Sequence, residues 1–521
     1  TQSYMSRIRG GLNWYDVRIG DEPLHGPAPT PDLLVALTDD AREVLGGELA
    51  DDGRVLHNSD APDDGAVVAI DLERVAQDVA DKTLYMSAVA AGAVFGLLGY
   101  DPDALGPLLE EEFADKGDDV VAANRECVDR GAELAAEEAG QLDAPEPGGE
   151  ARAVYDGATA VGLAAAAAGV KLVAAYPMTP ATATFTFLAA AADDYGIVVE
   201  QAEDEIAAIN MVCGAAYAGV PAMTMTSGGG LALMSEGLSL AGMMELPVVI
   251  LVAQRPAPAT GLPTRTAQQD LLFALRAGHG EFPRAIFTPG SVRQCYDLTR
   301  RALETAHRYQ TPVLILTDQF LQDMEQSMAE LDDSPAPIDR RIVTDPGDDY
   351  ERYAVTDSGI SPRAIPGGSA VVVCDSDEHA TDGHIAEDIN GHIEQQDKRM
   401  RKEDGLRDEA LGPERIGPDD ADTLLLAWGS TCGPAREAVD LLNADGGSVA
   451  LLHFAQVWPL DTDAVADAIG APDRLVCVEG NQTGQFRTLL RSVGLAHDCE
   501  LLTNYTGLPF TGADIAERIR Q

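Results

Sequence analysis

The sequence predicts a multidomain α/β protein with doubly wound parallel sheets, and three observations support this fold class. The chain has 521 residues, which at about 150 residues per domain leaves room for roughly three to four domains. Hydrophobic residues make up 45% and charged residues 23%, the composition of a folded globular protein. Short apolar runs alternate with helical patterns along most of the chain, as strands and helices do in parallel sheets.

Residues 1–142 form the first predicted domain. The chain begins at Thr1 in dense, motif-like sequence, so we expect an N-terminal piece to be missing. A Pro-Glu-Pro-Gly-Gly stretch within 143–149 is typical of a linker and gives the first domain boundary. The expected strands include 33–37 and 66–70, and the expected helices include 87–98 and 107–113.

Residues 150–331 alternate most regularly, which predicts a parallel, doubly wound sheet. The expected helices are 153–168, 181–195, 203–218 and 230–243, and the expected strands are 171–175, 197–200, 221–226 and 247–253. Residues 332–418 are polar or rich in Asp, Pro and Gly, so we interpret them as a partly ordered connector. Residues 419–521 form a third α/β unit, with expected strands at 424–428, 449–454 and 475–479.

The charge balance excludes some partners. Acidic residues number 86 and basic residues 36, and the formal net charge of -50 disfavours nucleic acid and anionic membranes. The acids are spread through every segment, which indicates a halophilic protein in a salt-rich cytosol. We find no bilayer-spanning apolar run and no signal peptide, and therefore expect a cytoplasmic location. The five lysines are Lys82, Lys116, Lys171, Lys398 and Lys402.

No metal site is predicted in this chain. The histidines His379, His384 and His392 of the connector match no standard ligand spacing, so we interpret that stretch as a solvated loop. The cysteines are far apart and form no CxxC pair, so any iron-sulfur cluster must belong to a partner chain. There are seven of them: Cys127, Cys213, Cys295, Cys374, Cys432, Cys477 and Cys499.

Three residues of the middle domain are expected at the carboxyl ends of strands, where open α/β sheets bind ligands. Thr179 follows the strand 171–175, and its alternative role is to cap the next helix. Glu205 lies in the first turn of a helix, and its alternative role is to stabilise that helix end. Arg255 follows an apolar strand, and its rigid fork suits either a carboxylate ligand or a surface ion pair.

A glycine run lies at the same expected edge. Ser227-Gly228-Gly229-Gly230 opens the helix that follows the strand 221–226. It matches neither the GxGxxG nor the GxxxxGK[ST] phosphate-binding pattern. We therefore expect close backbone packing at these glycines.

Motifs over nearly the whole chain resemble the alpha subunit of the 2-oxoacid:ferredoxin oxidoreductases, in the form with a gamma domain fused ahead of it. They occur in the family's order and approximate spacing, and the acidic composition suggests a haloarchaeal member. The motifs are Ser6-Arg7-Ile8-Arg9-Gly10-Gly11, Tyr176-Pro177-Met178-Thr179-Pro180, Glu203-Asp204-Glu205-Ile206-Ala207-Ala208 with Gly214-Ala215, Val252-Ala253-Gln254-Arg255, Gly261-Leu262-Pro263-Thr264-Arg265-Thr266 with Gln269-Asp270-Leu271, Gly278-His279-Gly280-Glu281-Phe282-Pro283-Arg284, and Glu479-Gly480-Asn481 with Thr483-Gly484-Gln485.

The resemblance implies a gamma-type domain, then a pyrimidine-type domain that binds thiamine diphosphate, then a transketolase C-terminal-like domain. The family's magnesium motif and its cysteine-bound iron-sulfur cluster are expected on a separate beta subunit. The two subunits would form a heterodimer or an alpha2beta2 heterotetramer. Glu205 is implied to protonate the aminopyrimidine ring, and Thr179 and Arg255 to hold the substrate. Tyr176 and Pro177 are implied to contact the cofactor.

The implied activity is coenzyme A-dependent oxidative decarboxylation of a 2-oxoacid, with reduction of ferredoxin. The fused arrangement favours 2-oxoglutarate, followed by pyruvate and branched-chain 2-oxoacids. Two other functions remain open. The beta subunit of a lipoamide-linked 2-oxoacid dehydrogenase also pairs a pyrimidine domain with a transketolase-type domain, but it lacks a unit like residues 1–140. A non-catalytic scaffold paralogue would not need Thr179, Glu205 and Arg255.

Overall fold

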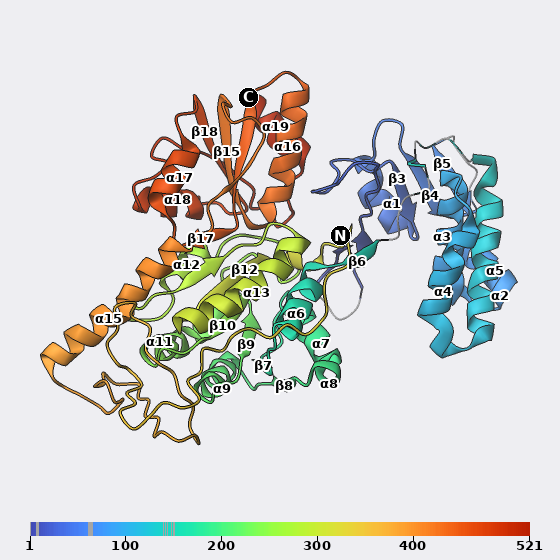
Figure 1. The fold of residues 1–521 in the computed structure, drawn as a ribbon. Coiled ribbons are helices and arrows are strands. Elements are labelled where there is room, and N and C mark those ends of the chain that lie inside the picture. The colour runs from blue at the N-terminus through green and yellow to red at the C-terminus, as the bar shows by residue number, and fades with distance from the viewer. Residues whose placement is uncertain are drawn as a thin grey trace.

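The computed structural model describes residues 2–6, 10–60, 66–138, 140, 142, 144–146, 148 and 152–521. Figure 1 shows an N-terminal α/β unit at one side, a central unit built on a large sheet, and a C-terminal unit above the central one. Helix α15 (Ile389–Asp408) runs beside the central unit and leads into the C-terminal unit. The predicted multidomain α/β fold is confirmed.

The N-terminal unit is a three-stranded parallel sheet, in the order β3-β4-β5, with helices packed on it. Its strands are β3 (Leu33–Ala36), β4 (Arg54–Asn58) and β5 (Val67–Ile70), and its helices are α1 (Asp39–Leu45), α2 (Leu72–Ala80), α3 (Met86–Leu98), α4 (Gly106–Phe113) and α5 (Asp118–Ala135). The strands and helices predicted within residues 33–113 are therefore confirmed.

Glycines allow α3 and α5 to approach each other closely. A Cβ atom at Gly92 would lie 1.9 Å from the carbonyl oxygen of Val128, and one at Gly131 would lie 2.0 Å from that of Val89. Such distances are shorter than any real carbon contact, so the two backbones can meet only where these side chains are absent.

The first residues of the chain contact the other two units. Strands β1 (Gln2–Ser3) and β2 (Trp14–Tyr15) form an antiparallel pair. The hydroxyl of Thr264 donates to the Tyr4 carbonyl oxygen at 2.7 Å, and Glu437 accepts the backbone N–H of His25 at 2.8 Å. Arg7, Ile8 and Arg9 of the predicted Ser-Arg motif lie outside the described residues, as do positions 143, 147 and 149 of the predicted linker.

The central unit contains a seven-stranded sheet in the order β17-β11-β12-β10-β9-β7-β8. All neighbours are parallel except β17, which pairs antiparallel with β11 and comes from the C-terminal part of the chain. The strands are β7 (Leu172–Ala175), β8 (Val198–Gln201), β9 (Ala222–Thr226), β10 (Val249–Gln254), β11 (Ala285–Phe287), β12 (Val313–Asp318) and β17 (Gln456–Trp458). The predicted doubly wound sheet is confirmed, and it binds the C-terminal unit through a shared strand.

Three predicted helices of the central unit are wrong in detail, and one of them, 181–195, is divided at Ala191 into two helices. Residues 153–168 begin with strand β6 (Ala153–Tyr155), which pairs with β13 (Gln326–Met328), and α6 starts only after the Asp156 cap. Residues 230–243 are two helices that meet at Met234. The helices of this unit are α6 (Gly157–Ala167), α7 (Thr182–Ala190), α8 (Ala192–Tyr195), α9 (Glu205–Tyr217), α10 (Gly228–Leu233), α11 (Ser235–Met243), α12 (Leu271–Arg276), α13 (Val292–Tyr309) and α14 (Gln319–Asp323).

The C-terminal unit has a five-stranded sheet in the order β14-β16-β15-β18-β19, in which only β14 is antiparallel. The three predicted strands correspond to β15, β16 and β18, so that part of the prediction is confirmed. Its elements are β14 (Glu414–Ile416), β15 (Thr423–Trp428), α16 (Cys432–Ala444), β16 (Val449–Phe454), α17 (Thr462–Ile469), β18 (Arg474–Glu479), α18 (Gln485–Ser492), β19 (Glu500–Thr503) and α19 (Gly512–Arg520).

The interpretation of the connector histidines as a solvated loop is wrong for two of the three, because His379 is buried and His392 lies in helix α15. His379 is fully buried, because its ring stacks on Tyr353 with 3.7 Å between the ring centroids. His384 and His392 are exposed and pair with Asp382 and Glu378. Within the described residues no cluster of three or more His, Cys, Asp or Glu side chains could hold a metal, and no helix there is long and apolar enough to cross a membrane.

The close approach of α3 and α5 gives a first prediction. Gly131→Ala should push the helices apart, destabilise the N-terminal unit by about 1–3 kcal/mol and increase amide hydrogen exchange in both helices. The control is Gly46→Ala, because a Cβ atom there meets nothing within 4 Å and φ is -61°. Unchanged exchange in Gly131→Ala would contradict the packing described here.

Candidate active site

The central sheet brings four loops to one edge. Strands β10, β9, β7 and β8 are parallel neighbours, so the segments that follow them leave the sheet at the same side. Thr179 follows β7, Glu205 follows β8, the glycine run 227–230 follows β9, and Arg255 follows β10. The residues selected from the sequence therefore share this edge.

Glu205 is buried at this edge and is not the helix cap. The side chain of Asp204 accepts the backbone N–H of Ala207 at 2.8 Å and so supplies the N-cap of α9. Glu205 is only 2% exposed, and its Oε1 atom has no hydrogen-bond partner within the described part of the chain. A carboxyl that served only the helix end would stay in water, because burying an unpaired carboxyl is unfavourable. The burial of Glu205 thus favours a ligand-binding role.

The glycine run packs directly against two carboxyl groups, as expected from the sequence. A Cβ atom at Gly230 would lie 2.6 Å from Glu205 Oε1 and 1.9 Å from Thr226 Oγ1. A Cβ atom at Gly228 would lie 2.4 Å from Asp270 Oδ1. Glycine is required at these two positions because any larger residue would displace those carboxyl groups.

Arg255 joins the loop after β10 to the loop after β7. Its Nη1 donates to the backbone oxygen of Thr179 at 2.7 Å, and burial lowers the pKa of the guanidinium. Thr179 lies in a turn outside α7, whose N-cap is Ala181, so its alternative role as a helix cap is wrong. Arg255 is only partly exposed, so it is not a simple surface ion pair either.

Asp270 belongs to the same site, and the sequence analysis assigned it no role. Its backbone N–H donates to Gln254 Oε1 at 3.0 Å, and its carboxyl points toward Gly228. The Oδ2 atom is buried without a partner in the described ranges. Burial raises the pKa of Asp270 to about 6, while the nearby charge of Arg255 opposes that rise. The only signal in the sequence was its place in the Gln269-Asp270-Leu271 motif.

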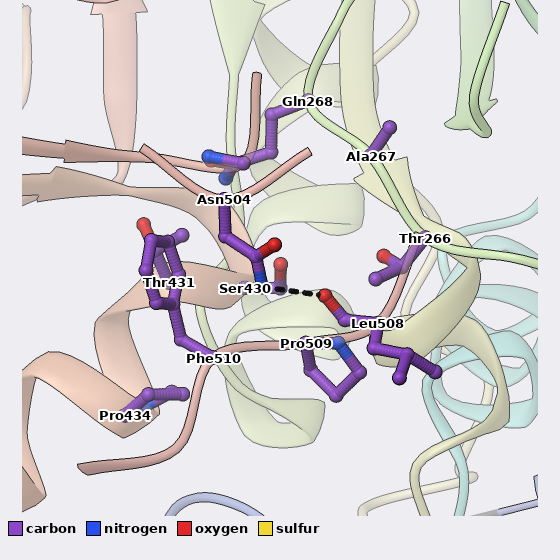
Figure 2. Close-up of a pocket in the computed structure, with 11 residues that line it drawn as sticks. Thr266, Ala267, Gln268, Ser430, Thr431, Pro434, Asn504, Leu508, Pro509 and Phe510 are labelled. Atoms are coloured by element: carbon purple, nitrogen blue, oxygen red, sulfur yellow. Dashed lines mark hydrogen bonds between the residues drawn. The ribbon is translucent and has the colours of Figure 1, made fainter. Parts of the chain in front are cut away.

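The C-terminal unit holds the loop that carries Asp270. Gln268 donates its backbone N–H to the Gly480 oxygen at 2.8 Å, and its Oε1 accepts the Gly480 N–H at 2.8 Å. Figure 2 shows Gln268 facing a small pocket between this loop and the C-terminal unit, where Asn504 bonds the Leu508 oxygen at 2.9 Å. The pocket is small, about 20 Å³, and Glu205 does not line it. Docking of the C-terminal unit therefore positions Asp270.

Exposed apolar side chains lie on the elements around Glu205. Tyr176 follows β7 and is 42% exposed, and the adjacent Pro177 is partly buried. Ile206 and Met211 on α9 are also exposed, as is Leu233 at the end of α10. Exposed apolar residues gathered near a site are typical of an interaction surface.

Comparison with known protein families gives three matches. Residues 163–398 match the family described as "Pyruvate flavodoxin/ferredoxin oxidoreductase, thiamine diP-bdg". Residues 1–134 match "Pyruvate ferredoxin/flavodoxin oxidoreductase", and residues 414–490 match "Transketolase, C-terminal domain".

Individual relatives are similar over most of the chain. The chain is 36% identical to 2-oxoacid:ferredoxin oxidoreductase 1, subunit alpha, of Sulfurisphaera tokodaii, over 70% of this chain and 60% of the relative. It is 30% identical to 2-oxoacid:ferredoxin oxidoreductase 2, subunit alpha, of Aeropyrum pernix, over 86% of this chain and 73% of the relative. The chain thus spans about 60% of the length of the first of these relatives.

A solved structure is similar over the full chain. It is the 2-oxoglutarate:ferredoxin oxidoreductase from Magnetococcus marinus with 2-oxoglutarate, coenzyme A and succinyl-CoA bound. The TM-score is 0.92 and the sequence identity 31%, with 100% of this chain and 93% of that chain covered.

The buried carboxyl of Asp270 gives a prediction for pH dependence. Its raised pKa means that the folded protein binds this proton more tightly than the unfolded chain, where an Asp titrates near pH 4. The resulting stabilisation is complete below that unfolded value and is lost as the pH rises through about 6. When the pH is raised from 5 to 7.5, the unfolding free energy of Asp270→Asn should increase by roughly 1 kcal/mol relative to that of the wild type.

The measurement is urea unfolding of both proteins at the two pH values, with Asp473→Asn as the control because Asp473 is exposed. The unfolding free energy of the control should differ from that of the wild type by the same amount at both pH values. If Asp270→Asn also behaved in this way, Asp270 would not be the buried titrating group described above.

Proposed function

Because the chain belongs to the family of 2-oxoacid:ferredoxin oxidoreductase alpha subunits, we propose that it forms one half of a thiamine diphosphate active site. A beta subunit completes that site. The complex converts a 2-oxoacid and coenzyme A to acyl-CoA and CO2, and passes the two released electrons to ferredoxin. The observation that carries this proposal is the buried carboxyl of Glu205, whose Oε1 has no partner within the described residues.

The residues at this edge fit the pyrimidine side of thiamine diphosphate. The Glu205 carboxyl would hold a proton at the ring nitrogen, and the absence of a side chain at Gly230 leaves Oε1 in its observed position. Tyr176 and Pro177 follow β7 at the same edge and would contact the ring. When bound, the cofactor supplies a nucleophilic carbon and accepts the electrons released by decarboxylation.

Arg255 and Thr179 bind the substrate in this proposal. A guanidinium presents a planar fork that matches the carboxylate of a 2-oxoacid. One of its nitrogens already bonds the Thr179 backbone, which fixes the orientation of the others and costs little further ordering on binding. The Thr179 hydroxyl then orients the 2-oxo oxygen.

The partner is a beta subunit that covers the apolar side chains around Glu205. Tyr176, Ile206, Met211 and Leu233 would otherwise stay in water. We place the magnesium ion and the iron-sulfur cluster on that subunit, because the cysteines of this chain are dispersed along the sequence. The name "subunit alpha" of the relatives supports the existence of a partner. We propose an alpha2beta2 assembly in the cytoplasm.

The proposed substrate is 2-oxoglutarate, with pyruvate next. The Magnetococcus enzyme is a 2-oxoglutarate:ferredoxin oxidoreductase, and a Mycobacterium tuberculosis relative, 29% identical over 98% of this chain, is called 2-oxoglutarate oxidoreductase subunit KorA. Residues 1–142 form the proposed fused gamma-type domain, and the match of residues 1–134 to an oxidoreductase family supports it over a lipoamide-linked dehydrogenase. The other proposed domains are 150–331, the connector 332–418, and 419–521.

Replacing the Glu205 carboxyl by an amide tests its role as a proton-holding group. In the complex with its beta subunit, Glu205→Gln should lower 2-oxoacid-dependent reduction of a viologen dye by about 10²–10⁴-fold, the usual range for a lost acid-base group. Stability and assembly should be nearly unchanged, because an amide has almost the same size.

The matched control is Glu203→Gln, which makes the same change at an exposed position two residues upstream. It should keep full activity. If Glu205→Gln retained activity within about threefold of wild type at saturating cofactor, the catalytic role would be wrong. If the wild-type complex reduced no dye with any 2-oxoacid, the alternative of a non-catalytic scaffold would be supported instead.

A further inference from the structure

Buried cations gather at the opposite end of the central sheet from Glu205. Arg352 and Arg363 of the connector are only 2% and 3% exposed, and Lys398 and Lys402 of α15 are completely buried. Arg352 donates a hydrogen bond to Glu245 in the loop before β10, and Lys402 donates one to Gln310 in the loop before β12. Burial of charged side chains is unfavourable unless each charge is compensated, and this chain has a large excess of acids elsewhere.

The two lysines have partners. Glu245 is itself buried, accepts Lys398 Nζ at 2.6 Å and forms an ion pair with Lys402. Lys398 also donates to Ser361 Oγ at 2.9 Å, and Lys402 to the Gln310 oxygen at 3.0 Å. The single carboxyl of Glu245 is therefore already shared by two cations.

The two arginines have no carboxylate of their own, although Arg352 also lies over the Tyr353 ring, 4.7 Å from its centroid. Arg352 Nη2 donates to the Glu245 backbone oxygen at 3.0 Å, and Arg363 Nη2 to that of Arg340 at 3.3 Å. Arg352 Nη1 and the Nε and Nη1 atoms of Arg363 are buried with no partner in the described ranges. No ion pair within those ranges reaches either guanidinium at 4 Å or less. Three buried nitrogen donor groups thus face no acceptor among the described residues.

The charge of Glu245 acts on Arg352, but that carboxylate is already paired with both lysines, and the side chains next to Arg363 supply no negative charge. Burial, together with the charges of Arg352 and Arg340, lowers the pKa of Arg363 to about 10, which is still far above neutral pH. Burial and the charge of Arg363 lower the pKa of His307 to about 3, so this imidazole is neutral. The Tyr350 hydroxyl already accepts the Ala364 N–H at 2.9 Å. Both guanidinium groups therefore keep their charge in a region without a free carboxylate.

We propose that a small monovalent anion of the halide class binds against Arg352 and Arg363. A halide accepts several N–H groups without a required direction, and its size suits a region enclosed by protein. The anion would also fasten the connector to the central sheet, because Arg363 pairs in a parallel β-bridge with Ile342 and Val343 N–H donates to its oxygen at 2.8 Å. This site is remote from Glu205 and does not rest on the proposed function.

The first test compares thermal unfolding of the full-length chain in potassium chloride and in potassium glutamate at equal ionic strength. The wild type should melt at least about 3 °C higher in chloride, since glutamate is too large for an enclosed halide site. This difference should vanish in Arg352→Met and Arg363→Met. It should persist in Arg341→Met, which removes an exposed arginine of the same segment. An equal difference in all four proteins, or none in the wild type, would overturn the proposal.

A second measurement needs no variant and decides the question if either substitution prevents folding. Crystals of the wild-type protein grown from molar potassium bromide should show an anomalous difference peak within hydrogen-bonding distance of Arg352 Nη1 or Arg363 Nη1. Bromide peaks confined to the protein surface would overturn the proposal.

Discussion

The candidate site depends on keeping the carboxyl of Glu205 buried while its Oε1 has no hydrogen-bond partner in the part of the chain that the structure describes. Burial strengthens every hydrogen bond that this carboxyl makes. An unpaired buried carboxyl is unfavourable in free energy until a ligand forms a hydrogen bond with it. Three features maintain this state: Asp204 caps the helix in its place, Gly230 leaves space beside Oε1, and β7 and β9 put neighbouring loops at the same edge. A side chain at position 230 would collide with Thr226 Oγ1 and with Glu205 Oε1, and would displace the Glu205 carboxyl.

The same requirement explains why the three units are joined as they are. The loop that carries Asp270 is fixed by Gly480 of the C-terminal unit, and strand β17 extends the central sheet from that same unit. The N-terminal segment bonds Thr264, near the start of that loop. Contacts with the N- and C-terminal units therefore help to fix the loop that carries Asp270. In this account they act as the support that keeps the site organised before a partner arrives.

The sequence was sufficient for the features that depend on local pattern. The alternation of apolar runs and helical segments predicts the parallel sheet, and strand ends alone select Thr179, Glu205 and Arg255. Features that depend on distant contacts were missed. Thr179 was open to interpretation as a helix cap because the arginine that holds it is 76 residues away. Strand β6 was predicted as helix because its partner β13 lies more than 150 residues later. The burial of His379 and Asp270 depends on Tyr353 and Gly228, which local composition does not reveal.

The most direct test of the central claim is a crystal structure of the complex of this chain with its beta subunit and thiamine diphosphate. We expect Glu205 Oε1 to lie within about 3 Å of the aminopyrimidine ring nitrogen, the distance of a hydrogen bond, with Arg255 facing the substrate side of the cofactor. A cofactor bound elsewhere, or a side chain of the partner occupying the free oxygen of Glu205, would contradict the account.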